Sequence, residues 1–250
     1  MNPDNKDSVS LNKYISATGL CSRREADKLI EAGKVKLNGQ VAQKGNRVTD
    51  KDIVEVNGNR LDHNQKPEPI YLALNKPTGI ICTTDQRVRD NIVDFVNHKE
   101  RIFPIGRLDV PSEGLILMTN DGNIVNKILR ASNHHEKEYI VTVNKPITGK
   151  FLKQMASGVP IIDTVTRPCR IEKLNAKTFK IILTQGLNRQ IRRMCAHLGY
   201  DVIMLKRVRI MNIILGNLPT GQWRSLNDKE LVMLKKLLKS SKSTYKPGEE

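Results

Sequence analysis

Residues 106–115 read Gly106-Arg107-Leu108-Asp109-Val110-Pro111-Ser112-Glu113-Gly114-Leu115, and the interpretation of the whole chain starts from this stretch. Apolar runs of strand length flank it at 102–105 and 115–118. Two strands joined by a glycine-bracketed turn would hold the carboxylate of Asp109 in a fixed place. A turn aspartate bonded to nearby backbone is the commoner use of Asp between strands, so spacing alone leaves a structural and a catalytic role open.

The chain is strongly basic, and its charge is unevenly distributed. Its 250 residues carry a formal net charge of +16, with a sequence pI near 9.8. Residues 1–68 contain 12 Lys and Arg against 10 Asp and Glu, whereas residues 150–210 contain 13 against 3. A charge of this size predicts a polyanionic partner, and its distribution places the main electrostatic footprint in the later segment.

Several classes of protein are disfavoured by what the sequence lacks. No apolar run approaches the ~20 residues that a membrane-spanning helix needs, and the polar N-terminus shows no secretory signal. The four cysteines are scattered singly, which predicts reduced thiols in a cytoplasmic protein. The pair His134-His135 has no further ligands at metal-binding spacing, and glycine motifs for nucleotides are missing. We therefore expect no metal and no cofactor.

The first sixty residues show a helical period and then a strand period. Leu11, Tyr14 and Ile15 have helical spacing, and a second helix is predicted to start at Ser22, which forms a capping box with Glu25. From residue 35 the period changes to two, with Asn-Gly turns at 38–39 and 57–58, which predicts a small sheet of hairpins. The second helix leaves three basic residues to face solvent or a ligand, namely Arg23, Arg24 and Lys28.

The polar segment 62–68 is interpreted as an interdomain linker. It gives a first domain at 9–68, a second at 69–240 and a disordered tail at 241–250. The second domain mixes strands, expected around 70–74, 139–143, 170–174, 179–184 and 202–205, with helices expected around 124–129, 148–155, 188–198 and 227–238. This mixture predicts an α+β fold. The lone Trp223 is interpreted as a core anchor.

The stretch 188–198 has the most informative periodicity in the chain. On a helical wheel Arg192 and Arg193 lie within about 60° of Arg189, and the apolar residues Ile191, Met194, Cys195 and Leu198 occupy the opposite side. Asn188 is the expected N-cap, and a helix N-terminus favours anions. The segment therefore predicts a cationic face for phosphate or carboxylate groups. Lys206, Arg207 and Arg209 are expected to extend this basic surface.

Three ordered motifs resemble those of the pseudouridine synthases, in the branch that acts on ribosomal RNA. They are the central stretch 106–115, the triplet Lys137-Glu138-Tyr139 and the run from Gly186 to Met194. The residues before them resemble the small S4 RNA-binding domain. The resemblance implies an S4-like domain followed by a catalytic domain with a mixed, largely antiparallel β-sheet flanked by helices.

The resemblance also implies roles for individual residues. Asp109 matches the catalytic aspartate, Tyr139 matches the tyrosine of the site, and Arg192 matches the basic partner of the carboxylate. The residues alone would make Tyr139 a buried core residue, since it alternates with Val141 and Val143. Asp109 would act as nucleophile or general base, and the sequence leaves both open.

Other residues of the motifs are expected to contact RNA, because a stacked uridine must be flipped out before a carboxylate can reach it. The expected RNA-binding residues are Arg107, Leu108, Asp109, Val110, Arg189, Gln190, Ile191 and Arg192, together with Arg23, Arg24 and Lys28 in the first domain. The implied partner is 23S ribosomal RNA, with a transfer RNA anticodon arm as an additional substrate. A monomer needs no special feature.

Two alternatives use the same features differently. A non-catalytic RNA-binding or ribosome-assembly protein would explain the charge and the S4-like segment, but it leaves Asp109, Tyr139 and Arg192 unused. A hydrolase would use Asp109 with Glu113, because glycoside hydrolysis requires a pair of carboxylates. Few aromatic residues are available for a sugar platform, and the net charge suits RNA better than a neutral polysaccharide.

Overall fold

The computed structural model describes residues 8–62, 67–162 and 164–243, and the chain divides into two compact units, Met1–Pro69 and Ile70–Glu250. Residues 63–66 of the predicted linker and residues 244–250 of the predicted tail lie outside the described residues. The tail prediction was wrong for residues 241–243. Their backbone is held by side chains of Arg130 and Asn133, which accounts for its ordered path.

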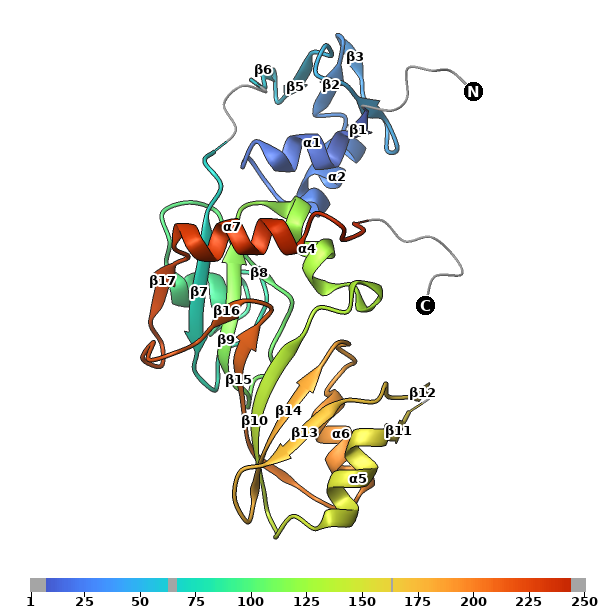
Figure 1. The fold of residues 1–250 in the computed structure, drawn as a ribbon. Coiled ribbons are helices and arrows are strands. Elements are labelled where there is room, and N and C mark those ends of the chain that lie inside the picture. Colours follow the sequence, from blue (N-terminus) through green and yellow to red (C-terminus); the bar gives the residue numbers. More distant parts are fainter. Residues whose placement is uncertain (1–7, 63–66, 163, 244–250) are drawn as a thin grey trace. The chain divides into compact units, whose positions relative to one another are not determined.

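The first unit combines two helices with a small sheet (Figure 1). Helix α1 (Leu11–Ala17) ends before Gly19, and α2 (Arg23–Glu31) begins at the predicted capping box of Ser22 and Glu25. The antiparallel sheet has the order β3 (Gln40–Val41), β2 (Val35–Leu37), β5 (Val54–Val56), β6 (Asn59–Arg60), and β1 (Val9–Ser10) pairs separately with β4 (Arg47–Val48). Asn38 and Asn57 both have positive φ angles, as does the glycine after each, so the Asn-Gly turns form as predicted.

The second unit is built on one mixed sheet, which has nine strands within the described residues. Seven follow the order β13 (Arg170–Lys173), β14 (Thr178–Leu183), β10 (Lys137–Val143), β15 (Val202–Ile210), β9 (Glu113–Thr119), β7 (Tyr71–Lys76), β17 (Trp223–Ser225). β8 (Phe103–Ile105) pairs with β9, and β16 (Ile213–Ile214) pairs with β15, while β11 (Pro160–Ile161) and β12 (Thr164–Val165) form a separate hairpin. β9 and β15 are parallel and the other paired neighbours are antiparallel, which confirms a mixed, largely antiparallel sheet.

Helices cover this sheet in three groups (Figure 1). α5 (Gly149–Ser157) and α6 (Gln190–His197) share a core with the inward residues of β10 and β14, and Phe151, Met194 and Cys195 are fully enclosed there. On β7 and β9, alternate residues point to opposite faces. α3 (Ile92–Val96) packs on one of these faces, and α4 (Gly122–Leu129) and α7 (Asp228–Leu237) pack on the other. The predicted apolar side of α6, with Ile191, Met194 and Cys195, is therefore confirmed.

Trp223 is not the core anchor that the sequence suggested. It lies on β17, at one end of the strand order, where 40% of its surface is exposed. Its ring meets the edge of His98, with ring centroids 5.6 Å apart. An edge strand has a neighbour on one side only, so its side chains are covered less well than those of a central strand. Every helix in the described part of the chain is too short or too polar to span a lipid bilayer.

Candidate active site

The three motifs of the second unit meet at one cavity of about 450 Å³. The predicted residues that line it are Arg107, Leu108, Asp109, Tyr139, Arg189, Gln190, Ile191 and Arg192. Val110 is 43% exposed and does not belong to the lining. Arg23, Arg24 and Lys28 lie exposed on α2, in the first unit. The cavity therefore unites predicted residues that are up to 85 positions apart, from Arg107 to Arg192.

Asp109 lies in a tight turn between β8 and β9. The Ser112 N–H donates to the Asp109 carbonyl over 3.0 Å, and the Gly79 N–H donates to the Val110 carbonyl over 2.9 Å. Main-chain groups therefore close this turn. The carboxylate itself lines the cavity, and 33% of the Asp109 side chain is exposed. This arrangement favours the catalytic interpretation over an aspartate that serves only to close its own turn.

Gly114 shows why the central motif needs a glycine after Glu113. Gly114 stands opposite Arg207 in the parallel pairing of β9 with β15, and its φ is +105°. A Cβ atom at this position would lie 2.3 Å from the Arg207 carbonyl oxygen and 2.7 Å from the Arg207 nitrogen. The backbone of β15 can therefore approach the Asp109 turn only because residue 114 has no side chain.

Two arginines at the start of α6 reach the Asp109 turn in different ways. Arg192 donates to the Pro111 carbonyl over 2.9 Å, to the Ser112 hydroxyl over 3.1 Å and to the Val202 carbonyl over 3.1 Å. Arg189 has its Nη1 atom 4.0 Å from an Asp109 carboxylate oxygen. The expected direct pairing of Arg192 with the carboxylate is thus not found, because its two terminal nitrogens hold the turn and the end of β15. Arg189 is the arginine at ion-pair distance.

The first turn of α6 differs from the prediction. The helix begins at Gln190 with Arg189 as N-cap, and Asn188 does not cap it because its side-chain oxygen accepts from Arg193 Nη2 over 2.7 Å. Gln190 folds back so that its side-chain oxygen accepts from the Leu187 N–H over 3.1 Å. Arg189 has left-handed backbone angles (φ 51°), which cost of order 1 kcal/mol or more in a non-glycine residue. This strained residue is the one beside Asp109.

Two buried cations line the cavity that the sequence analysis did not assign to the site. Lys137 is 6% exposed and Arg207 is 4% exposed. Arg207 donates from Nε to the Leu115 carbonyl over 2.6 Å, while its Nη2 atom is buried with no hydrogen-bond partner among the described residues. Lys137 donates to the His135 carbonyl over 3.3 Å. Burial, with Arg207 nearby, lowers the pKa of Lys137 to about 8.

The interpretation of Arg207 and Arg209 as one exposed basic surface was therefore wrong. Arg207 lies opposite Tyr139 in the pairing of β15 with β10, in the middle of the sheet. Arg209 is bound by Glu136 and Glu138, each with a carboxylate oxygen 3.0 Å from its Nη2 atom. Alternate residues of a strand share one face. Residue 137 shares a face with Tyr139, and residue 207 shares a face with Leu205, so this alternation could have identified both cations as buried.

Glu113 does not provide a second carboxylate to the cavity. Its side chain lies 3.6 Å from Lys206 Nζ, and it is outside the lining that Asp109 and Ser112 help to form. The pair of carboxylates that the hydrolase alternative requires is therefore not assembled. Within the described ranges, no three His, Cys, Asp or Glu side chains gather closely enough to hold a metal ion.

Lys137→Met is expected to raise the free energy of unfolding at pH 7 by about 1–3 kcal/mol. The pKa of Lys137 falls from its ordinary 10.5 to about 8, so between these values the unfolded chain binds more protons. Below pH 8 Lys137 therefore lowers the free energy of unfolding by its full amount, and this destabilisation disappears as the pH rises to 10.5. Urea unfolding of the wild type and of Lys137→Met from pH 7 to 10.5 should show that the stability gained by the substitution decreases as the pH rises. A gain that is constant with pH would contradict the assignment, and the exposed Lys177→Met serves as control.

Comparison with known proteins agrees with this geometry. Residues 70–197 match the family described as RNA pseudouridylate synthase, and residues 9–54 match the S4 domain. The chain is 56% identical to the dual-specificity RNA pseudouridine synthase RluF of Escherichia coli strain K12, over 99% of this chain and 84% of that protein. It is 35% identical to the ribosomal large subunit pseudouridine synthase B of Bacillus subtilis strain 168, over 94% of this chain and 99% of that protein.

A solved structure supports the same assignment. A crystal structure of a pseudouridylate synthase superimposes with a TM-score of 0.66 at 29% identity, and it covers 92% of this chain and 99% of that one. The family match spans more than half of the chain and contains Asp109, Tyr139 and Arg192. The resemblance inferred from the three motifs is thereby confirmed. The chain belongs to the RNA pseudouridylate synthase family, as an isomerase that carries an S4 domain ahead of its catalytic domain.

Proposed function

We propose that this enzyme isomerises a specific uridine of 23S ribosomal RNA to pseudouridine, and that a uridine in a transfer RNA anticodon arm is a second substrate. The Escherichia coli relative is named for dual specificity, and the Bacillus subtilis relative is named for the large ribosomal subunit. The observation that carries the proposal is the convergence of Asp109, Tyr139 and the α6 arginines on one cavity. An isomerase gives each of these residues a role, whereas a non-catalytic RNA-binding protein would give them none.

Asp109 is proposed as the catalytic group. The reaction breaks the bond from the base nitrogen to the ribose, turns the uracil and joins it again through carbon. A carboxylate can serve this reaction as a nucleophile at the sugar or as a general base. Arg189, at 4.0 Å, supplies positive charge beside the carboxylate, and Arg192 fixes the turn through Pro111 and Ser112. Arg192 is thus proposed as a positioning residue.

The remaining cavity residues are proposed to hold the flipped uracil. Tyr139 is 9% exposed and belongs to the same apolar cluster as Leu108 and Leu205, so its ring offers a stacking surface and its hydroxyl a site for moving the C5 proton. Uracil has two carbonyl oxygens, which accept hydrogen bonds. The buried Nη2 atom of Arg207 and the ammonium group of Lys137 are the matching donors. Arg107, which is exposed at the rim, would contact a phosphate.

The proposed enzyme works as a monomer in the cytoplasm, without metal or cofactor. The isomerisation moves a base within one nucleotide, so nothing is oxidised and no group is carried away. The chain's net charge of +16 attracts the RNA itself.

The S4 domain is proposed to dock on the RNA through Arg23, Arg24 and Lys28 of α2. Replacing all three by Gln should lower RNA affinity and reduce the slope of log affinity against log salt by about 2, since each lost phosphate contact to single-stranded RNA removes roughly 0.7. A filter-binding titration at several salt concentrations measures both. The control replaces Lys34, Lys36 and Lys51, three exposed lysines of the same unit. An equal effect of the two triple variants would show that α2 is not the docking face.

The function itself is tested by carbodiimide primer extension over ribosomal and transfer RNA. RNA is taken from cells that lack this protein, before and after adding back the wild type or Asp109→Asn. Pseudouridine keeps a carbodiimide adduct that stops reverse transcriptase. A stop that disappears in the deletion and returns only with the wild type names the substrate and supports Asp109. If no stop changes in either RNA class, the proposed substrates are wrong.

A further inference from the structure

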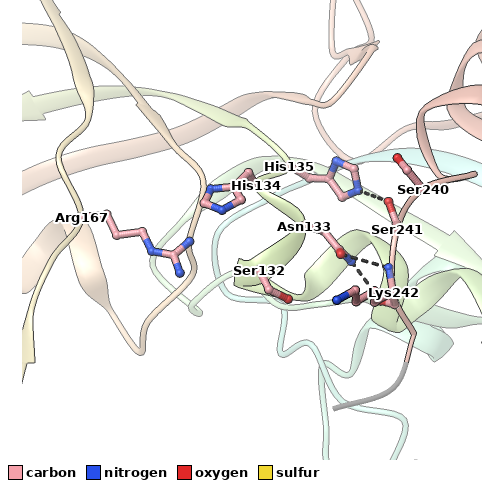
Figure 2. A pocket seen from close by; sticks show the side chains of 8 residues that line it. All are labelled: Ser132, Asn133, His134, His135, Arg167, Ser240, Ser241 and Lys242. Atoms are coloured by element: carbon pink, nitrogen blue, oxygen red, sulfur yellow. Dashed lines mark hydrogen bonds between the residues drawn. The ribbon is translucent and has the colours of Figure 1, made fainter. Parts of the chain in front are cut away.

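A second cavity, of about 500 Å³, lies beside the catalytic one and is lined by polar residues (Figure 2). It is formed by three segments: residues 132–135, which follow α4, Arg167, which precedes β13, and residues 240–242, which follow α7. The lining consists of two histidines, an arginine, a lysine, an asparagine and three serines. All of these side chains can donate a hydrogen bond and none is a carboxylate, so the cavity suits an anion.

The walls of this cavity are tied together by hydrogen bonds. The side chain of Asn133 exchanges two bonds of 3.0 Å with the backbone of Lys242, and His135 Nε2 lies 2.8 Å from the Ser241 hydroxyl, as Figure 2 shows. Arg167 Nη1 donates to the Ala131 carbonyl over 2.8 Å, which fixes the guanidinium against the 131–133 turn (η2, Ala131–Asn133). Arg167 and His135 are therefore held in place before any ligand arrives, which lowers the entropic cost of binding one.

The positive charge of the cavity comes from Arg167 and Lys242. His135 is partly buried, and this burial, with Lys137 and His134 nearby, lowers its pKa below the ordinary value of 6.5. His135 is therefore mostly neutral at pH 7, and its ring contributes a hydrogen bond with the Ser241 hydroxyl. The guanidinium of Arg167 and the ammonium group of Lys242, among further hydrogen-bond donors and without a carboxylate, suit the charged oxygens of a phosphodiester.

Two direct contacts connect this cavity with the catalytic one. The Arg167 backbone N–H donates to the side chain of Gln185, and Gln185 lines the catalytic cavity. Lys137, which also lines the catalytic cavity, donates to the carbonyl of His135. The two cavities are thus separated by the thickness of single residues. This second cavity is therefore within a few nucleotides' reach of a uridine placed beside Asp109.

We propose that the cavity formed by residues 132–135, Arg167 and residues 240–242 binds a backbone phosphodiester of the substrate RNA, at a nucleotide close to the flipped uridine. This inference rests on the proposed function, because it assumes that a uridine occupies the cavity of Asp109. The volume exceeds that of one phosphate and admits the adjoining ribose. Free inorganic phosphate shares the same chemistry, and the experiment separates the two.

The first arm measures RNA affinity and its salt dependence with Arg167→Gln in the full chain. The RNA is a stem-loop that contains the uridine identified by primer extension. Loss of one charged contact should weaken binding about ten-fold and reduce the salt slope by roughly 0.7. Lys242→Gln is the second variant, because it removes the other cationic side chain of the lining while the Lys242 backbone can still bind Asn133. Lys177→Gln removes the same charge from an exposed site outside both cavities and should leave the slope unchanged.

The second arm identifies the phosphate. Each phosphate of the stem-loop is replaced in turn by an uncharged methylphosphonate. A methylphosphonate at one position near the uridine should weaken RNA binding to the wild type and to Lys177→Gln. The same methylphosphonate should cause no further loss of affinity with Arg167→Gln, because the contact to that phosphate is already absent. If every position weakens Arg167→Gln and the wild type equally, the proposal is overturned. A histidine NMR shift with inorganic phosphate alone, without such a coupled position, would assign the cavity to free phosphate and also overturn it.

The outcome is separable from that of the proposed function. Both arms measure binding only, whereas the proposed function is judged by pseudouridine formation. A coupled phosphate in an RNA that the wild type does not isomerise would support the phosphate cavity and contradict the assigned substrate. Isomerisation of an RNA that has no coupled phosphate would support the assigned substrate and contradict the phosphate cavity.

Discussion

Asp109→Asn is expected to lower the rate of pseudouridine formation by at least about 10³-fold, since it removes the carboxylate that acts as nucleophile or general base. RNA affinity should stay within a few-fold of the wild type, because the lost charge is negative and the phosphate contacts remain. Single-turnover reactions with excess enzyme, read by carbodiimide primer extension, measure the rate, and filter binding measures the affinity.

The matched control is Glu113→Gln, which removes a second carboxylate from the same motif. Glu113 faces Lys206 outside the cavity lining, so its loss should change the rate by less than about ten-fold. Equal losses in the two variants would show that Asp109 has no special role. Retained activity in Asp109→Asn would return Asp109 to the status of a turn residue.

Gly114→Ala is expected to lower the free energy of unfolding by about 3–5 kcal/mol. The added Cβ would lie 2.3 Å from the Arg207 carbonyl oxygen, and the φ of +105° is unfavourable for any side chain. Overpacking and backbone strain each cost about 1–3 kcal/mol, and the obstacle is backbone, which cannot rotate away. Urea unfolding at constant pH measures the change.

Gly149→Ala is the control for this substitution. Gly149 opens α5, and an added Cβ would meet no heavy atom within 4 Å. Its replacement should leave stability unchanged or raise it by up to about 1 kcal/mol. If Gly114→Ala unfolds within about 1 kcal/mol of the wild type, the close approach of β15 to the motif is not as tight as the distances indicate.

Local signals in the sequence predicted their structures well. The capping box of Ser22 and Glu25, the turn at Asn38 and the start of a helix near residue 148 all form as expected. Each depends on hydrogen bonds or backbone angles within three or four residues, so its free energy changes little with the rest of the fold. The alternation of Tyr139, Val141 and Val143 likewise predicted a strand with one buried face.

Two side-chain contacts at the start of α6 were not predicted, one within the segment and one with a distant turn. Asn188 was expected to cap α6, but its side chain binds Arg193. Arg192 was expected at the carboxylate, but the Pro111 carbonyl and the Ser112 hydroxyl, about 80 positions earlier, take up its guanidinium. In each case a partner that the local pattern does not reveal competes for the same group.

The sequence by itself determined the family, the two domains' types, most helices and strands, and the identity of Asp109 and Tyr139 as candidate residues. Only the tertiary structure decided which cations serve the cavity. Lys137 and Arg207 are buried because β15 pairs with β10 and comes within reach of Gly114. Arg189, which has a left-handed backbone, lies at ion-pair distance from Asp109. The reason is physical: side-chain periodicity fixes which face a residue occupies, whereas long-range strand pairing fixes what covers that face.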